Sequence, residues 1–459
     1  MQSTSYPELE RILEWFLGFI KPVEWCERKR EIEKRLEDIH RPKKSHQGAI
    51  NHQSISFQKH DKMGWTMSWY LYLAEMLLTE PTKYEAMQGA RVIPIFERLG
   101  ADLELLHQIG GINEKVERLL SFGKKGILEP DATLFEILVA LLWKRNGWDD
   151  VSFKTESTVH KEKTPDIRAA SGNNEWIIEC KRLNGRSEYS EKERKKWLRM
   201  WIHLRNYLID KRIPAIFEIV FHVELESLSD DFLVKQLAGK LPFLSSQCIV
   251  ISNEQLQISF DTVNFDKARE HLERFSVKMG SSQLCELIAG YRNPNRGFTH
   301  VVLGGTEYSG DGRSNNKYLT TMDFAAGAFW HCDAEKSIDK KARDTRKRLV
   351  EGFDQLPKDR KSVVHVGLET LDGVLVEKKR YERIFNTVMN FDNQGKDLRW
   401  IYCHSFQSYS PPEQTWFYDE TVSYFNHTEF TEQPLEYMGV MVTEKDISID
   451  GVHWLRDVP

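Results

Sequence analysis

The stretch Thr164–Arg182, TPDIRAASGNNEWIIECKR, contains two short strand-like runs joined by a turn. Ser171–Asn174 between them has turn chemistry, because Gly and Asn tolerate the positive φ that a tight hairpin needs. The run before this turn opens with Pro165-Asp166, and the run after it ends with Glu179-Cys180-Lys181. The stretch therefore predicts a β-hairpin whose open end is charged.

The predicted hairpin gathers charged side chains at one place. Side chains alternate across a strand, so Glu179 and Lys181 should emerge side by side on one face of the second strand. Asp166, at the start of the first strand, should lie next to them. The opposite face should be apolar, with Trp176, Ile178 and Cys180. Two carboxylates beside an ammonium at a sheet edge predict a site for a hard cation with a positive neighbour.

Pro165, Asp166, Glu179 and Lys181 resemble the motif of the PD-(D/E)xK nuclease superfamily, the fold of many restriction endonucleases and Holliday-junction resolvases. The order of the predicted elements supports the resemblance. These are a helix over 131–146, a strand over 150–155, the two hairpin strands, a helix over 190–211 and a strand over 215–223. This is the αβββαβ core of the restriction-endonuclease-like fold.

The length of 459 residues indicates more than one domain. We expect an α/β protein with a helical N-terminal region over 1–125, the restriction-endonuclease-like core over 126–225, and an additional α/β region over 226–459 of unknown role. The last region should contain a basic helix over 337–356, a buried strand over 362–368, a helix over 377–390 and a strand over 400–404.

Composition narrows the class of protein. The formal charge of −5 excludes a globally basic coat, so any surface for nucleic acid must be local. The six cysteines are scattered without a paired spacing, which favours buried thiols in a reducing compartment. No run reaches 18 apolar residues. We therefore expect a cytoplasmic protein without a membrane span.

Glu136 is an acid within the apolar helix over 131–146, and it has two interpretations. In the first, Thr133 and Glu136 form a capping box at the start of the helix. In the second, Glu136 faces the sheet and adds a carboxylate to the cation site, as the corresponding helix often does in the resembled superfamily. The sequence leaves both open.

The resemblance implies a catalytic site for phosphodiester hydrolysis. Asp166 and Glu179, with the backbone carbonyl of Cys180, would hold Mg²⁺, for which Mn²⁺ could substitute. Lys181 would orient the attacking water and stabilise charge on the phosphate, and whether it also acts as a general base stays open. Glu136 would help to recruit a second metal ion. The alternative is an ordinary cross-strand ion pair on a solvated sheet face.

A basic segment follows the predicted site. Residues 181–200 contain eight basic and three acidic side chains. Arg182, Arg186, Lys192 and Lys195 are candidates to bind the phosphate backbone of a nucleic acid. The alternative is a solvated helix face with a Glu191–Lys195 pair. Trp197 and Trp201 are expected in the core and not as a stacking platform for bases.

Taken together, these features predict a Mg²⁺-dependent endonuclease that acts on DNA in preference to RNA. A homodimer and a partner protein are both compatible with the sequence, because double-strand cleavage by this fold usually needs two active sites. Restriction or antiviral defence is the setting that the resemblance suggests. The alternatives are a nuclease-fold module that binds nucleic acid or a partner protein without cleaving it, and a structural or signalling protein.

Overall fold

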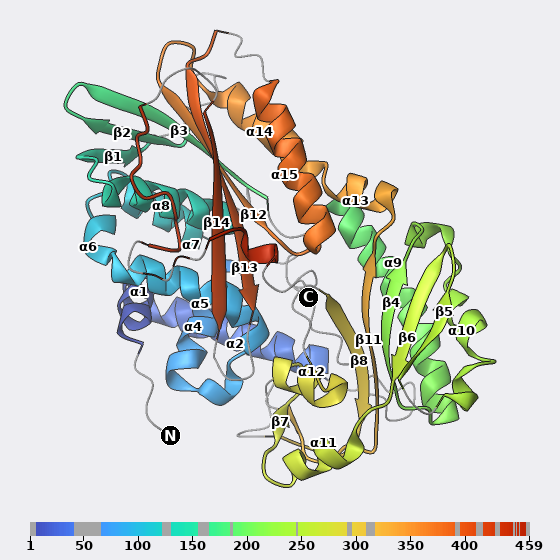
Figure 1. The fold of residues 1–459 in the computed structure, drawn as a ribbon. Coiled ribbons are helices and arrows are strands. Elements are labelled where there is room, and N and C mark those ends of the chain that lie inside the picture. The colour runs from blue at the N-terminus through green and yellow to red at the C-terminus, as the bar shows by residue number, and fades with distance from the viewer. Residues whose placement is uncertain are drawn as a thin grey trace.

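The computed structural model describes residues 6–40, 66–121, 130–154, 165–183, 187–244, 247–291, 296–308, 317–390, 395–409, 416–426, 432–443, 446, 448 and 450–455. The chain forms two lobes, each built on its own mixed β-sheet with helices packed against it (Figure 1). The prediction of an α/β protein is therefore confirmed.

The first lobe contains a six-stranded sheet in the order β1-β2-β3-β12-β13-β14. Neighbouring strands are antiparallel except for β12, which runs parallel to both β3 and β13. The strands are β1 (Asp150–Phe153), β2 (Ile167–Ser171), β3 (Asn174–Arg182), β12 (Ser362–Glu369), β13 (Leu398–Tyr409) and β14 (Phe417–Asn426).

The strand next to β3 differs from the prediction. The run expected to complete this sheet is β4 (Ala215–Phe221), and it lies in the other sheet. β12 pairs with β3 instead, with Val364 opposite Glu179. Both β4 and β12 are apolar strands, and a local pattern does not encode which of them pairs with β3. The sheet that carries the predicted site therefore extends far beyond the predicted core of residues 126–225.

Helices cover both faces of the six-stranded sheet. α8 (Pro130–Arg145) packs on one face with Trp176 and Ile178, and α14 (Asp344–Gln355) packs on the other with Val364. α15 (Val374–Met389) lies beside α14 (Figure 1). The predicted basic helix over 337–356 is two helices, because α13 (Glu335–Lys341) ends before α14 begins.

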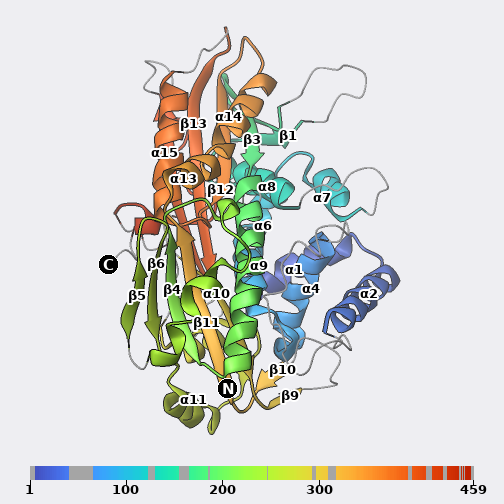
Figure 2. The same ribbon diagram turned by 90° about the vertical axis from the view of Figure 1, so that its right-hand side faces the viewer.

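The N-terminal region is helical, as predicted, and packs beneath α8 in the same hydrophobic core. Figure 2 shows its helices on the side of the sheet away from α14 and α15. They are α1 (Pro7–Gly18), α2 (Pro22–His40), α4 (Thr66–Thr79), α5 (Ala86–Ala101), α6 (Leu103–Leu106) and α7 (Ile112–Leu120), with the short η1 (Pro81–Lys83).

The second lobe comprises residues 187–341 and is inserted between β3 and α14. Its main sheet has the order β5-β6-β4-β11-β8, and a small sheet has the order β7-β10-β9. The further strands are β5 (Cys248–Ser252), β6 (Leu256–Asp261), β7 (Val277–Lys278), β8 (Gly297–Leu303), β9 (Thr306–Tyr308), β10 (Lys317–Leu319) and β11 (Phe324–Cys332). The helices are α9 (Glu188–Lys211), α10 (Phe232–Leu237), α11 (Phe265–Leu272) and α12 (Ser282–Ala289).

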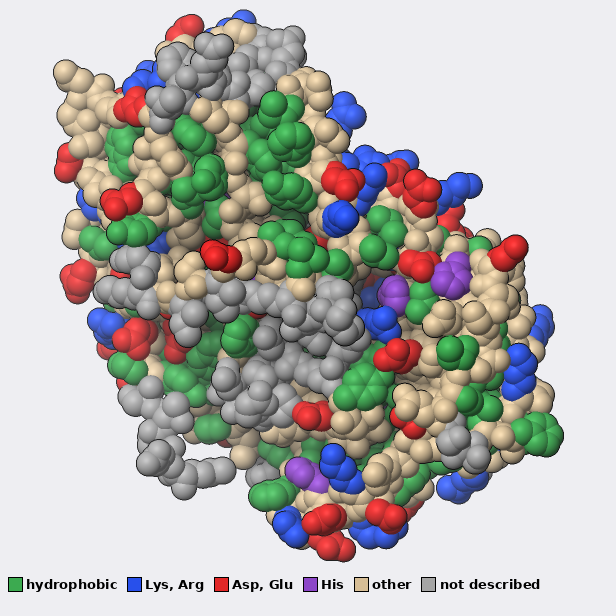
Figure 3. Space-filling model, in the orientation of Figure 1, with side chains coloured by type: hydrophobic (Ala, Val, Ile, Leu, Met, Phe, Trp, Pro, Cys, Tyr) green, Lys and Arg blue, Asp and Glu red, His purple; other side chains and the backbone are tan. Residues whose placement is uncertain are grey.

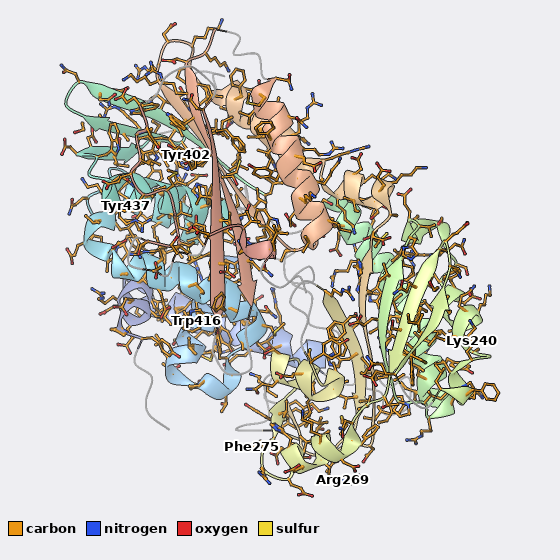
Figure 4. All side chains as sticks on the ribbon, in the orientation of Figure 1. Lys240, Arg269, Phe275, Tyr402, Trp416 and Tyr437 are labelled. Carbon is orange, nitrogen blue, oxygen red and sulfur yellow. The ribbon has the colours of Figure 1, made fainter. Side chains whose placement is uncertain are left out.

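Each lobe has its own core. Trp197 and Trp201 of α9 are buried in the core of the second lobe, as predicted. Tyr402 is buried in the first lobe, whereas Arg269 and Phe275 lie at the outer end of the second (Figure 4). In the described segments, no helix has the length and apolar character needed to cross a membrane.

Candidate active site

The hairpin forms as predicted and places Asp166 against β3. Gly172 in the turn has a φ of 56°, which is a conformation that Gly adopts without strain. Ile167 of β2 lies opposite Ile178 of β3, so Asp166 reaches the next positions of that strand. The Cys180 backbone amide donates a hydrogen bond to Asp166 Oδ2 at 2.8 Å.

Glu179 and Lys181 project from β3 toward α14. The Glu179 side chain is fully buried, and its Oε1 pairs with Lys181 Nζ. Its Oε2 accepts no hydrogen bond from an N–H or hydroxyl group, but the Glu179 and Asp166 carboxyl groups lie within hydrogen-bonding reach of each other. Lys181 Nζ also donates to the side-chain oxygen of Gln355, at the end of α14. Gly352 lets α14 approach this closely, because a Cβ built there lies 3.3 Å from Lys181 Cγ. The sequence had given no indication of Gln355 or Gly352.

Glu136 belongs to the charged cluster. The capping-box interpretation is wrong, because α8 begins at Pro130 and Thr133 is buried within the helix. The Glu136 carboxylate pairs instead with Lys115 of α7. Lys115 was not predicted from the sequence, because it lies in a separate helix with no motif around it.

The carboxyl groups of the cluster are hard to ionise. Burial raises the pKa of Glu179 to about 8, and the nearby charge of Asp166 adds to the shift. Burial and then the charge of Asp166 raise the pKa of Glu136 to about 7. Burial also raises the pKa of Asp166, against the effect of the Cys180 amide. Negative charges crowded in a poorly solvated space create a place that favours a cation.

Lys181 keeps its proton in this arrangement. Burial alone would lower its pKa, but the Glu179 carboxylate outweighs burial and raises it. A protonated lysine can orient and neutralise a phosphate but cannot accept a proton. The geometry thus argues against Lys181 as the general base in the metal-free protein.

The cluster offers two carboxylates to a metal ion. Across the ranges that the structure describes, no three His, Cys, Asp or Glu side chains are grouped so that they could hold one. Glu136, the third acid, is turned to Lys115, which leaves Asp166 and Glu179. Oxygen ligands of this kind fit Mg²⁺, which usually takes one or two carboxylates and keeps several waters. The Asp166 and Glu179 carboxyl groups lie within hydrogen-bonding reach of each other, so one metal ion could contact both.

Cys180 contributes its backbone and not its thiol. The side chain is buried in the core with Trp176 and Ile178, as predicted. Burial raises the pKa of the thiol far above its ordinary value, so a reactive thiolate is disfavoured. Cys180 is therefore a spacer between Glu179 and Lys181.

Arg182 lies inside the molecule. Its guanidinium pairs with buried Glu369 at 2.9 Å and stacks over the Phe406 ring at 4.8 Å. Arg91 pairs with the same Glu369 oxygen at 2.7 Å. These contacts favour a structural role for Arg182 over the predicted phosphate contact.

The other predicted nucleic-acid contacts lie in or near α9, in the second lobe. Lys192 is exposed and pairs with Glu188 at 2.8 Å. Lys195 is exposed, but the predicted Glu191–Lys195 pair is replaced by a Glu191–Arg194 pair at 3.4 Å. Arg186 lies outside the described residues.

The start of α9 also differs from the prediction. Its N-cap is Ser187, which accepts a hydrogen bond from the Ser190 amide, and not Ser190 itself. Glu193 is buried and pairs with Lys341 of α13. The helix thus begins earlier, and Glu193 joins α9 to α13.

A buried chain of hydrogen bonds lies on the opposite face of the sheet. Trp143 Nε1 donates to His365 Nε2 at 3.2 Å, and His365 Nδ1 lies 2.9 Å from His404 Nε2. His404 Nδ1 lies 2.9 Å from Glu420 Oε1. Because the Trp143 indole can only donate, His365 Nδ1 donates to His404, and His404 Nδ1 donates to Glu420, with both imidazoles neutral. These hydrogen bonds link α8 to β12, β13 and β14, and they were not predicted from the sequence.

Known proteins give no guide to this site: no protein-family model, no curated protein and no solved structure matches the chain. The function of the site is therefore inferred from the arrangement of its own residues.

Proposed function

We propose that this protein is a Mg²⁺-dependent nuclease, and that Asp166 and Glu179 hold the metal ion. The observation that carries the proposal is the meeting of two buried carboxyl groups, Asp166 and Glu179, beside the protonated Lys181. Two buried carboxyl groups this close cannot both be ionised without a large cost unless a cation lies between them. Mn²⁺ is expected to substitute for Mg²⁺.

The roles of the residues follow from their positions. A bound divalent ion would lower the pKa of a water molecule and neutralise charge on the phosphate. Asp166 is oriented by the Cys180 amide, and Glu179 is fixed by Lys181. Lys181, held between Glu179 and Gln355, would place its ammonium beside the scissile phosphate. Because its proton is retained, the proton of the attacking water goes to solvent or substrate.

We also propose that the catalytic core is restriction-endonuclease-like, with a different composition from that predicted. The elements α8, β1, β2, β3, α14 and β12 follow the αβββαβ order of the PD-(D/E)xK superfamily, with the second lobe inserted before α14. α8 and α14 lie on opposite faces of the four strands. Both the motif and this order support the proposal.

The expected substrate is DNA rather than RNA, and the expected setting is restriction or antiviral defence in the cytoplasm. These two statements rest on the resemblance alone. Lys192 and Lys195 remain candidates to contact the phosphate backbone, since both are exposed. Double-strand cleavage would require two copies of the site, so a homodimer belongs to the proposal.

A cleavage assay tests the proposal. The purified chain is incubated with linear, circular and branched DNA and with RNA, in Mg²⁺, Mn²⁺ or EDTA. Cleavage in the presence of metal that Glu179→Ala abolishes, without change in the fold as measured by circular dichroism, is the expected result. A Glu179→Ala variant with full activity would refute the assignment of the site.

A second function is a nuclease-fold module that binds nucleic acid or a partner protein without cleaving it. One observation favours it: Glu136 is already paired with a cation of the protein, Lys115. In that case the assay gives no cleavage of any substrate, while a gel-shift experiment on the same substrates, or capture of a partner protein, still detects binding.

A further inference from the structure

Lys115 brings a second ammonium group into the charged cluster, beside Glu136. Its ammonium pairs with Glu136, and both side chains are largely buried, at 21% and 16% exposed. The ammonium also lies 5.2 Å from the centre of the Phe153 ring of β1, a favourable contact for a cation. Lys115 is therefore fixed against both α8 and β1.

The helix that carries Lys115 is firmly held. α7 follows Gly111, whose φ of 77° requires a residue without a side chain. The apolar side of α7 is buried in the core of the first lobe and comprises Ile112, Val116, Leu119 and Leu120. The packing of α7 in the core therefore holds Lys115 beside Glu136.

The two lysines divide the carboxylates between them. Lys115 pairs with Glu136, and Lys181 pairs with Glu179. Both ammonium groups lie near enough to Asp166 to lower its pKa, so Asp166 is the carboxylate that the two pairs share. Lys115 therefore already neutralises the carboxylate, Glu136, that a second metal ion would need.

The charge balance agrees with a single metal ion. Three carboxylates against the ammonium groups of Lys115 and Lys181 leave a net charge of −1 when all are ionised. One divalent ion brings the cluster to +1, which the single negative charge of a phosphodiester neutralises. A second ion would bring it to +3 in a poorly solvated space, which is strongly disfavoured.

We propose that Lys115 substitutes for the second metal ion, so that the site binds one divalent ion between Asp166 and Glu179 and excludes another beside Glu136. This inference rests on the proposed function, because it assumes the first ion. It predicts that removal of the Lys115 ammonium creates a second ion site from side chains that are already in place.

The test is the number of Mn²⁺ ions bound per chain, measured by isothermal titration calorimetry and by electron paramagnetic resonance of free Mn²⁺. We expect one ion for the wild type and two for Lys115→Met. The double variant Lys115→Met/Glu136→Gln should return to one, because the new site loses its carboxylate. Lys29→Met is the matched control, since Lys29 pairs with Glu75, which is not a carboxylate of the site, at 2.7 Å and with similar burial, 28% and 18% exposed.

The outcomes are distinguishable. A wild type that binds no divalent ion refutes the proposed function. A wild type with one ion and a folded Lys115→Met variant with one or none refutes only the role of Lys115, as does a wild type with two. If Lys115→Met fails to fold, Lys115→Gln, which keeps a donor to Glu136 but no charge, replaces it with the same expected count of two.

Discussion

Glu179 is buried in a way that a purely structural residue would not need to be. Its carboxyl group has no contact with solvent, and Asp166 adds a second negative charge within hydrogen-bonding reach. Each of these conditions lowers the stability of the ionised form. The site therefore carries a cost in stability that a bound cation would remove.

Replacement of Glu179 by Gln should stabilise the metal-free protein at alkaline pH. The folded state binds the Glu179 proton more tightly than the unfolded state, since the pKa rises from 4.5 to about 8 on folding. The wild type thus loses stability as the pH rises from 4.5 to 8, by roughly 2–4 kcal/mol. Glu179→Gln removes this loss and keeps only the losses from Glu136 and Asp166, whose pKa values are also raised. Thermal melts in EDTA should show a higher Tm for the variant at pH 8.5 and little difference at pH 4. Equal Tm values at pH 8.5 would contradict this account.

Arg182 should matter for stability more than for binding. Arg182→Ala leaves Glu369 with Arg91 as its remaining ion-pair partner in a buried place, so the free energy of unfolding should fall by about 2 kcal/mol. Lys192→Ala removes an exposed pair and should change it by less than about 0.5 kcal/mol. Thermal unfolding measures both. A stable Arg182→Ala variant with weakened nucleic-acid binding would restore the role predicted from the sequence.

The elements around the site differ in how far the sequence predicts them. The hairpin of β2 and β3 was predicted with its turn and its two faces, because strand alternation and turn chemistry are local properties. α8, β12 and α15 were also found close to their true bounds, whereas β13 runs to Tyr409 and is much longer than the predicted 400–404. The pairing of β3 with β12 was not predicted, because it joins segments far apart in the chain. Lys115 and Gln355 were missed for the same reason: each reaches the site from a distant helix.

Close packing of α14 against β3 should be required for activity. A Cβ at position 352 lies 3.3 Å from Lys181 Cγ and 3.7 Å from Glu179 Cγ, so the longer side chain of Gly352→Leu must displace both. A shift of about 1 Å should lower metal-dependent cleavage roughly 100-fold. Gly18→Leu is the control, because nothing lies within 4 Å of its Cβ. Wild-type cleavage rates for Gly352→Leu would show that α14 does not position Lys181.

At the scale of the whole molecule, the chain is one lobe interrupted by another. The first lobe is assembled from both ends of the chain, and it presents exposed apolar side chains over α15 and β14 that include Tyr381, Phe385 and Tyr424 (Figure 3). The second lobe is continuous and has its own complete sheet. A division of the sequence into consecutive domains could not have revealed this arrangement.

The nested arrangement predicts which fragments fold. A fragment of residues 187–341 keeps the five-stranded sheet and its core, so it should fold alone and unfold cooperatively. A fragment of residues 126–225 separates β3 from β12 and β4 from β6 and β11, so it should remain unfolded or aggregate. Two-dimensional NMR spectra of both fragments would decide. A well-dispersed spectrum from the second fragment would contradict the arrangement of the strands.

The central claim is that Asp166 and Glu179 together bind one divalent ion. The most direct measurement is an anomalous difference map from crystals of the protein grown or soaked with Mn²⁺. The account predicts a single peak between the two carboxylates, within bonding distance of both, with Lys115 still beside Glu136. A map without a peak at these carboxylates, or with the ion bound elsewhere, would contradict it.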